Sequence, residues 1–315
     1  MPFARQRLRA PAIRRPAVLV MLLNCFFMLI FIEMFRSGVN DGRNWAAIRP
    51  RIPRFTLRYT ENGCYNTCMN KTLDRRLEVD QIRALAIHMF TASGALAGMM
   101  SLLHLFRNDV TGTLMWLGVA LVIDSIDGPL ARRFQIDKAL PQVDGATLDN
   151  VIDYSTYTLI PAIFIYHFGF MPVGWGLPVA GVVVVSSLYC FANKALKTRD
   201  NFFTGFPATW NLVALSFYVL ETPPALNVVI VLLCTALTFV PITFVHPFRV
   251  RAFRPITMAL TFVWAALAVF LVLERANTSG LAANAPFAYW GFILVSVYFV
   301  VISIRRSIRG KPDAP

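Results

Sequence analysis

Long apolar segments recur along most of the chain, and the short stretches between them hold most of the charged residues. Each segment is close to the length that a helix needs to cross the hydrocarbon core of a bilayer, about 20 residues. From residue 84 onward eight such segments follow one another, at 84–105, 112–128, 146–169, 173–192, 205–220, 226–245, 256–273 and 287–304. The pattern predicts an all-α integral membrane protein with about eight transmembrane helices.

The part of the chain before the first predicted span divides into two segments. Residues 69–83 are polar and typical of an amphipathic helix on the membrane surface, whereas residues 1–68 form an Arg/Pro-rich N-terminal extension with one short apolar run, 17–32. That run is flanked by arginines on both sides, so either orientation across a membrane would conflict with the positive-inside rule. We expect residues 69–315 to be the membrane domain. An interfacial helix, or a start codon chosen too early with Met69 as the true start, would explain residues 1–68.

Basic residues are concentrated in alternate loops, which predicts how the chain is oriented. In the other set of loops the only basic residues are Arg107 and Arg275. The basic side consists of the polar lead, three loops and the tail, with Lys71, Arg75, Arg76, Arg83, Arg132, Arg133, Lys138, Lys194, Lys197, Arg199, Arg249, Arg251, Arg254, Arg305, Arg306, Arg309 and Lys311. By the positive-inside rule, both ends of the membrane domain and the loop between the second and third spans face the cytoplasm.

The composition agrees with a membrane protein and argues against nucleic-acid binding. The chain is 57% hydrophobic and 15% charged, which is too little charge for a typical soluble domain. The net charge of +13 is uneven, because residues 1–68 hold eleven arginines against three acids. The excess that remains is ordinary for a protein with basic loops on one side of a membrane.

The predicted spans contain four acidic residues, and all four lie in one stretch, 124–153. Asp124 and Asp127 are three residues apart, and Asp149 and Asp153 are four apart, so each pair lies on one face of a helix. An unpaired carboxylate in the middle of a membrane costs about 2.5–3.5 kcal/mol, so a cluster of four needs a purpose. Oxygen ligands without histidine or cysteine favour hard ions such as Mg2+ or Mn2+. The spacing therefore predicts a divalent metal site.

Small and basic residues accompany the acids. Gly128 and Gly145 would let a ligand or a helix approach closely, and Arg132 and Arg133 place positive charge beside the cluster, suited to a pyrophosphate. Together these features favour phosphoryl chemistry on a lipid-linked diphosphate. Two alternatives stay open. The acids could form structural salt bridges with Arg132, Arg133 and Lys138, or they could form a cation-transport site.

The pattern DxxDGxxAR at 124–132, followed by GxxxDxxxD at 145–153, resembles the signature of the CDP-alcohol phosphatidyltransferases. The two halves are separated by twelve residues, 133–144. This long spacing, and phrases such as TLDNVIDYSTYTLIPA at 147–162, resemble the bacterial phosphatidylcholine synthases of that family. The resemblance covers about residues 78–308, and the N-terminal extension falls outside it.

The resemblance implies a fold, a reaction and a set of site residues. It implies a CDP-alcohol phosphatidyltransferase-like helical fold, a homodimer in the bacterial inner membrane, and transfer of phosphatidyl from CDP-diacylglycerol to choline with release of CMP. Two Mn2+ or Mg2+ ions would be held by Asp124, Asp127, Asp149 and Asp153. Asp153 would also be the general base. The CDP-diacylglycerol pocket would be lined by Gly128, Ala131, Arg132 and Gly145.

The acceptor alcohol is a separate question. Choline is a quaternary ammonium, which proteins bind with aromatic faces. Tyr154, Tyr157 and Trp210 are candidates, since the predicted topology places them towards the cytoplasmic side. A related transferase that uses serine or glycerol phosphate is the alternative within the family. A cation transporter would not need the Asp-Gly-x-x-Ala-Arg element.

Overall fold

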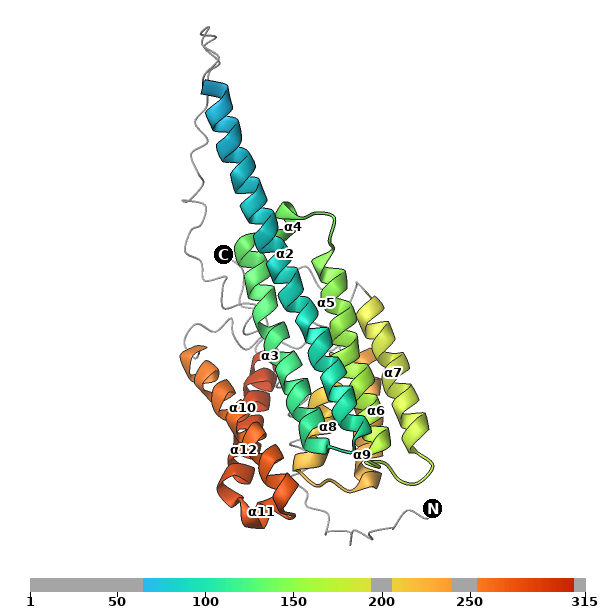
Figure 1. Cartoon of the computed structure of the whole chain (residues 1–315). Helices are drawn as coiled ribbons and strands as arrows, with labels where there is room; N and C mark the ends of the chain where they lie inside the picture. Colours follow the sequence, from blue (N-terminus) through green and yellow to red (C-terminus); the bar gives the residue numbers. More distant parts are fainter. Residues whose placement is uncertain (1–64, 194–205, 240–253, 309–315) are drawn as a thin grey trace.

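The computed structural model describes residues 65–193, 206–239 and 254–308, and within these ranges the regular structure is entirely helical (Figure 1). The predicted N-terminal extension lies outside the described residues except for its last four, Tyr65–Cys68, which begin the first described helix. The all-α class predicted from the hydrophobic pattern is confirmed for the described part of the chain.

A helix lies at each of the eight predicted spans. The elements are α2 (Tyr65–Phe106), α3 (Val110–Phe134), α4 (Ile136–Ala139), α5 (Gly145–Asp153), η2 (Tyr154–Leu159), α6 (Ile160–His167), α7 (Gly176–Ala192), α8 (Trp210–Val219), α9 (Pro224–Phe239), α10 (Arg254–Asn277), α11 (Leu281–Asn284) and α12 (Pro286–Ile308). The predicted span 146–169 corresponds to the consecutive elements α5, η2 and α6. Within the described ranges, three helical stretches are long and apolar enough to cross a membrane, Glu78–Phe106, Val110–Phe134 and Ile256–Asn277. Four shorter helices are also apolar, which agrees with a membrane protein, and the number of spans stays a prediction.

The polar lead at 69–83 is helical as predicted, but it is not a separate surface helix. It continues without a break into the first predicted span, so that α2 is a single helix of 42 residues. No glycine or proline lies between Met69 and Ala84, so nothing in the sequence interrupts the backbone hydrogen bonds of the helix. Figure 1 shows the first turns of α2 projecting beyond the other helices.

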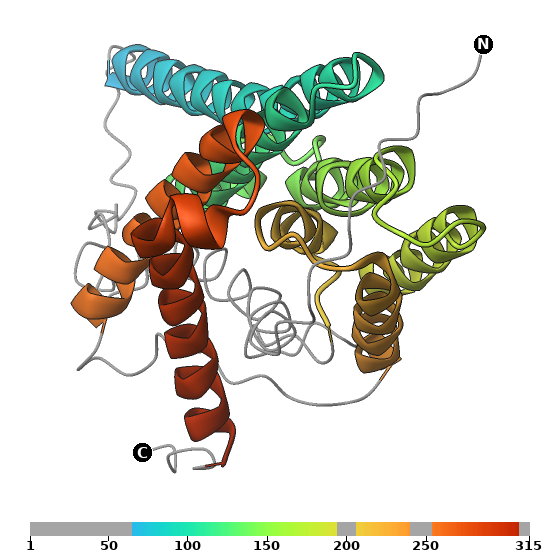
Figure 2. The same cartoon turned by 90° about the horizontal axis from the view of Figure 1, so that it is seen from below.

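α8 lies at the centre of the helix arrangement and contacts α3, α6, α10 and η2. Seen from the end of the bundle, α10 and α12 lie on one side of α8, whereas α7 and α9 lie on the other (Figure 2). Large side chains fill the space between these helices, and Trp210, Phe164, Phe217, Phe292 and Phe299 are almost completely buried. Two indole groups hydrogen-bond across helices, from Trp210 Nε1 to Ser187 Oγ (2.8 Å) and from Trp264 Nε1 to Ser296 Oγ (3.0 Å).

Two glycines bring α2 close to α5 and η2. A Cβ atom at Gly94 would lie 3.1 Å from Ile152 of α5, and one at Gly98 would lie 3.2 Å from Thr156 of η2. Because these distances are tighter than ordinary contacts, α2 can pack this closely only with small residues at the interface. The four-residue spacing puts both glycines on one face of α2. This face fixes the distance between α2 and the predicted site.

Asp109 joins α2 to α3 at the end of the bundle away from α4. Its side chain accepts a hydrogen bond from the backbone N–H of Gly112 (2.8 Å) and so caps α3. The other carboxylate oxygen lies 2.8 Å from Nδ1 of His104. The bond from Gly112, followed by the bond with His104, lowers the pKa of Asp109 below its usual value. The turn between the two longest helices is therefore held by a carboxylate that stays ionised at neutral pH.

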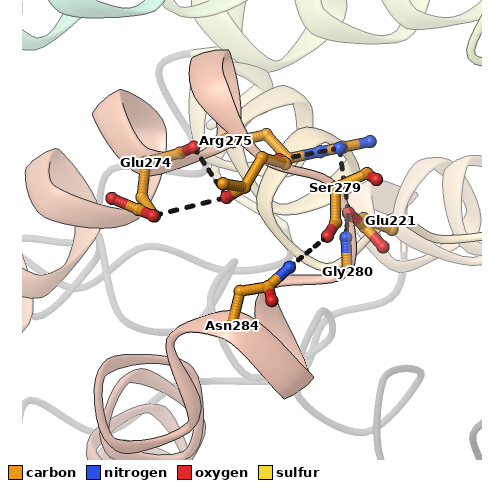
Figure 3. A network of polar contacts seen from close by, with 7 residues as sticks. Glu221, Glu274, Arg275, Ser279, Gly280 and Asn284 are labelled. Atoms are coloured by element: carbon orange, nitrogen blue, oxygen red, sulfur yellow. Dashed lines mark hydrogen bonds and ion pairs between the residues drawn. The ribbon is translucent and has the colours of Figure 1, made fainter.

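A second polar network joins α8 to the α10–α11 connection (Figure 3). Glu221 Oε1 accepts from Arg275 Nη1 (3.0 Å) and from the backbone N–H of Gly280 (2.8 Å). The Arg275 guanidinium also lies 5.8 Å from the ring centre of Tyr218. One carboxylate thus holds together the end of α8 and the start of α11.

We expect Glu221→Ala to lower the apparent melting temperature of the detergent-solubilised protein. The change leaves the half-buried Arg275 and the Gly280 N–H without their acceptor. Buried hydrogen bonds to charged groups contribute about 1.5–3 kcal/mol each to stability. We expect a smaller loss here, because the side chains of Arg275 and Glu221 are about a quarter exposed. Scanning fluorimetry measures the shift. Glu274→Ala is the matched control, since among the described residues that carboxylate hydrogen-bonds only to Thr278, one turn away. An equal fall in both variants would contradict the role of Glu221.

Candidate functional site

Three of the four predicted metal-binding acids come together in the structure. Asp124 of α3 and Asp149 and Asp153 of α5 each offer a carboxylate oxygen, and these atoms all lie within 4.8 Å of one another. All three side chains are half-buried. Asp149 and Asp153 lie one turn apart on the same face of α5, as their spacing predicts.

Local signals in the sequence place α5 opposite α3. α3 ends at Phe134, where Gln135 adopts a left-handed conformation (φ 50°) that stops the helix. α5 begins after Asp144, whose side chain accepts hydrogen bonds from the backbone N–H groups of Ala146 (3.0 Å) and Thr147 (3.2 Å). An aspartate at this position is a strong helix start signal. Of the residues between the two halves of the motif, 133 and 134 end α3, and 135–144 form α4 and its flanking turns.

Asp127 occupies a different place from the other three acids. It is buried, with 5% of its surface exposed, and it is outside the group whose carboxylate oxygens lie within 4.8 Å of one another. The side chain of Thr91 on α2 lies next to its carboxylate, and the charges of Asp124 and Asp149 act on it. The Thr91 hydroxyl itself donates to the carbonyl of Ile87 in its own helix (3.3 Å). The structure therefore places Asp127 between the acidic cluster and α2. Its role as a fourth metal ligand stays a prediction.

Tyr157 makes a contact that the sequence did not indicate. Its hydroxyl donates a 2.7 Å hydrogen bond to Oδ2 of Asp124, and the side chain is almost completely buried. It belongs to η2, a π-helical segment of six residues that begins directly after Asp153. Segments of this kind are frequent at functional sites. Tyr157 was predicted as a choline-binding aromatic, and the structure shows a hydroxyl that fixes the orientation of Asp124.

The other two predicted aromatics lie in different surroundings. Tyr154 is half-buried, and its ring meets the edge of Phe191 on α7 at a centroid distance of 5.8 Å. Trp210 is fully buried, where its indole donates to Ser187 and its ring packs against Phe206. In this structure Trp210 is a packing residue with no exposed face for a ligand. Tyr154 and Tyr157 follow Asp153, the last acid of the cluster, along the chain, whereas Trp210 begins α8.

The four residues predicted to bind the donor substrate border the cluster. Gly128 and Ala131 are half-buried on α3, and Arg132 is exposed in its last turn. Gly145 is the first residue of α5, and a Cβ atom there would lie 3.1 Å from Cε1 of His88 on α2. No metal-ligand spacing in the sequence involves His88. The only sequence signal that could have pointed to it is its three-residue spacing from Thr91.

The donor set fits a hard divalent cation. Three carboxylates this close together repel one another, and a cation between them relieves that repulsion. Oxygen atoms are the ligands that Mg2+ and Mn2+ prefer. Two of the basic residues in the salt-bridge alternative have other contacts, since Lys138 Nζ donates to Gln135 Oε1 (3.0 Å) and the Arg133 guanidinium lies over the ring of Phe134 (5.9 Å). The salt-bridge alternative itself stays a prediction.

Comparison with known proteins gives consistent matches. A family model described as CDP-alcohol phosphatidyltransferase matches residues 85–240. A phosphatidylcholine synthase of Pseudomonas aeruginosa is 43% identical over 231 residues, which cover 73% of this chain and 94% of the relative. Those of Rhizobium meliloti and Borreliella burgdorferi are 37% and 31% identical, over 75% and 72% of this chain and 96% and 98% of the relatives.

We expect Asp149→Asn to weaken Mn2+ binding by about tenfold or more, because it removes one of three clustered carboxylates. Binding is measured by electron paramagnetic resonance on the purified protein in nanodiscs, and requires no substrate. Asp144→Asn is the matched control, since asparagine also caps a helix and Asp144 lies outside the cluster. Equal affinity in both variants would remove Asp149 from the metal site.

Proposed function

Because the chain belongs to the CDP-alcohol phosphatidyltransferase family, we propose that this enzyme transfers the phosphatidyl group of CDP-diacylglycerol to choline and releases CMP. The observation that carries the proposal is the 43% identity over 94% of a relative named phosphatidylcholine synthase. The acidic cluster of α3 and α5 supplies the chemistry that such a reaction needs.

The reaction is a substitution at phosphorus. The choline hydroxyl oxygen forms a bond to the phosphorus that bears the diacylglycerol, and the bond from that phosphorus to the CMP oxygen breaks. Two divalent ions, Mn2+ or Mg2+, would neutralise the charge of the diphosphate and so make CMP a better leaving group. The residues that would hold them are Asp124, Asp149 and Asp153, with Asp127 as the fourth.

Asp153 is proposed as the general base. A choline hydroxyl is a weak acid, and a carboxylate within hydrogen-bond reach would accept its proton as the new bond forms. Asp153 is half-buried at the last position of α5, where η2 changes the helical register. Tyr157 would keep Asp124 in one orientation through its 2.7 Å hydrogen bond, so that the cluster is formed before substrate arrives. Tyr154, which follows Asp153 directly, is proposed to contribute an aromatic face to the choline site.

The donor's diphosphate would lie at the mouth formed by α3 and α5. Gly128 and Gly145 leave room for it, with Ala131 beside them, and exposed Arg132 would attract its charge. The basic loops on this side support a cytoplasmic orientation in the bacterial inner membrane. Eight spans and a homodimer are proposed on the family likeness and the hydrophobic pattern.

An apolar cavity beside the site supports a lipid substrate. It has a volume of about 360 Å³ and lies between α3, α8 and α10. Its lining runs along α3 from Leu114 to Ile123, which directly precedes Asp124, and includes Ala268 of α10. We propose that an acyl chain of CDP-diacylglycerol occupies this cavity while the diphosphate lies at the acidic cluster.

The reaction is tested in membranes supplied with CDP-diacylglycerol, Mn2+ and labelled choline, with serine and glycerol phosphate in parallel. We expect label in phosphatidylcholine with release of CMP, and a loss of about 100-fold or more in turnover with Asp153→Asn, the usual size of a general-base contribution. Mn2+ affinity and folding of that variant are measured separately.

If label enters lipid only from serine or only from glycerol phosphate, that alcohol and not choline is the acceptor. Full turnover by Asp153→Asn would remove Asp153 from the role of base. No transfer from any acceptor by folded protein would favour the cation-transport interpretation of the acidic cluster.

The cavity is tested with Ala268→Phe. The added ring would fill space beside α3, so we expect a several-fold higher KM for long-chain CDP-diacylglycerol and a smaller change for a short-chain analogue. Ala266→Phe is the matched control, because Ala266 lies on the same helix, is exposed and does not line the cavity. The same effect on both chain lengths would contradict an acyl-chain site.

A further inference from the structure

His88 is a buried histidine with an unused hydrogen-bonding atom. Only 5% of its surface is exposed, and its Nε2 has no hydrogen-bond partner among the described residues. A large majority of buried polar side-chain atoms in proteins have a partner, so an exception calls for an explanation. A bound ligand that supplies the partner is one such explanation.

The imidazole ring lies against the first residue of α5. A Cβ atom at Gly145 would be 3.1 Å from Cε1 of His88 and 3.6 Å from its Nδ1, so a side chain at position 145 would press on the ring. The ring therefore occupies space that the glycine leaves open. The contact joins α2 to the second half of the motif, one helical turn before Asp149.

The same face of α2 also reaches the first half of the motif. Thr91, three residues after His88, has its side chain next to the carboxylate of Asp127 on α3, and residues three apart lie on one side of a helix. His88 and Thr91 thus form a third wall of the site, between α3 and α5. None of the motif residues predicted from the sequence belongs to this wall.

We propose that His88 Nε2 hydrogen-bonds the cytidine monophosphate part of the donor and positions it; this inference rests on the function proposed above. The nucleotide carries hydrogen-bonding atoms on its phosphate, ribose and base, whereas choline has only its hydroxyl, which in the proposed reaction lies at Asp153. His88 lies against Gly145, which precedes the proposed base, Asp153, by eight residues, or about 12 Å along the helix axis. His88 is therefore on the donor side of the site and away from the acceptor.

The test separates donor binding from acceptor binding. For His88→Leu we expect about a tenfold rise in the KM for CDP-diacylglycerol and in the inhibition constant of CMP, with the KM for choline unchanged. His88→Gln should restore most of the donor affinity, because the glutamine amide can occupy the position of Nε2. His88→Asn should not, because its amide reaches only the position of Nδ1.

His104→Leu is the matched control. His104 lies on the same helix sixteen residues away, about 24 Å along its axis, and pairs with Asp109 at the other end of the bundle. We expect it to leave both KM values unchanged, even if it lowers the melting temperature. The Gln and Asn variants keep the comparison valid if His88→Leu does not fold.

The inference is overturned by equal donor KM values in wild type and His88→Leu, by equal effects on donor and choline, or by His88→Asn binding as well as His88→Gln. Binding of CMP to purified protein with Mn2+, measured by calorimetry, separates this result from the reaction itself. Wild-type protein that binds CMP but transfers nothing to choline would refute only the choline reaction. Undiminished CMP binding by His88→Leu would refute only the role of His88.

Discussion

The mutual repulsion of carboxylates held close together in an apolar setting is the constraint on which the arrangement of α2, α3 and α5 depends. Asp124, Asp149 and Asp153 bring three negative charges within 4.8 Å, and Asp127 adds a fourth nearby. Such a group is stable only if its helices cannot separate and if a cation or hydrogen-bond donors offset the charge. The close packing of α2 serves the first need, and the hydrogen bond from Tyr157 to Asp124 serves the second.

The helices are held together by small residues and by interhelical hydrogen bonds. Gly94 and Gly98 let α2 approach α5 and η2 so closely that a Cβ atom at either position would crowd the facing side chain. Tyr157 of η2 donates a hydrogen bond to Asp124 of α3, and the side chain of Thr91 on α2 lies next to Asp127. Within a membrane, apolar contact between helices gains little over contact with lipid, so packing of small residues and hydrogen bonds have to supply the association. The Trp210–Ser187 and Trp264–Ser296 pairs extend the same principle through the rest of the bundle.

Much of this arrangement could be predicted from local sequence patterns. Apolar segment lengths located the helices, and three- and four-residue spacings placed Asp149 and Asp153 on one face. Contacts between distant segments were not predictable in this way. His88 and Thr91 lie more than 30 residues before the positions they meet, and no periodicity links them to α3 or α5. The burial of Trp210 was not predictable either, because an aromatic residue in a predicted span has the same local pattern whether it faces a ligand or the core.

The π-helical turn of η2 constrains how this chain can vary in length. The backbone N–H of Ile160 bonds to the carbonyl of Ser155, five residues back, so η2 contains one residue more than an α-helix would need at that turn. In a regular α-helix, one residue inserted or removed would rotate one flank against the other by about 100°. The wider turn of η2 takes up its extra residue, so that α5 keeps its acids towards Asp124 while α6 keeps Phe164 in the core. A change of length elsewhere in α5 or α6 has no such turn to take it up, and it would turn either the acids away from Asp124 or Phe164 out of the core.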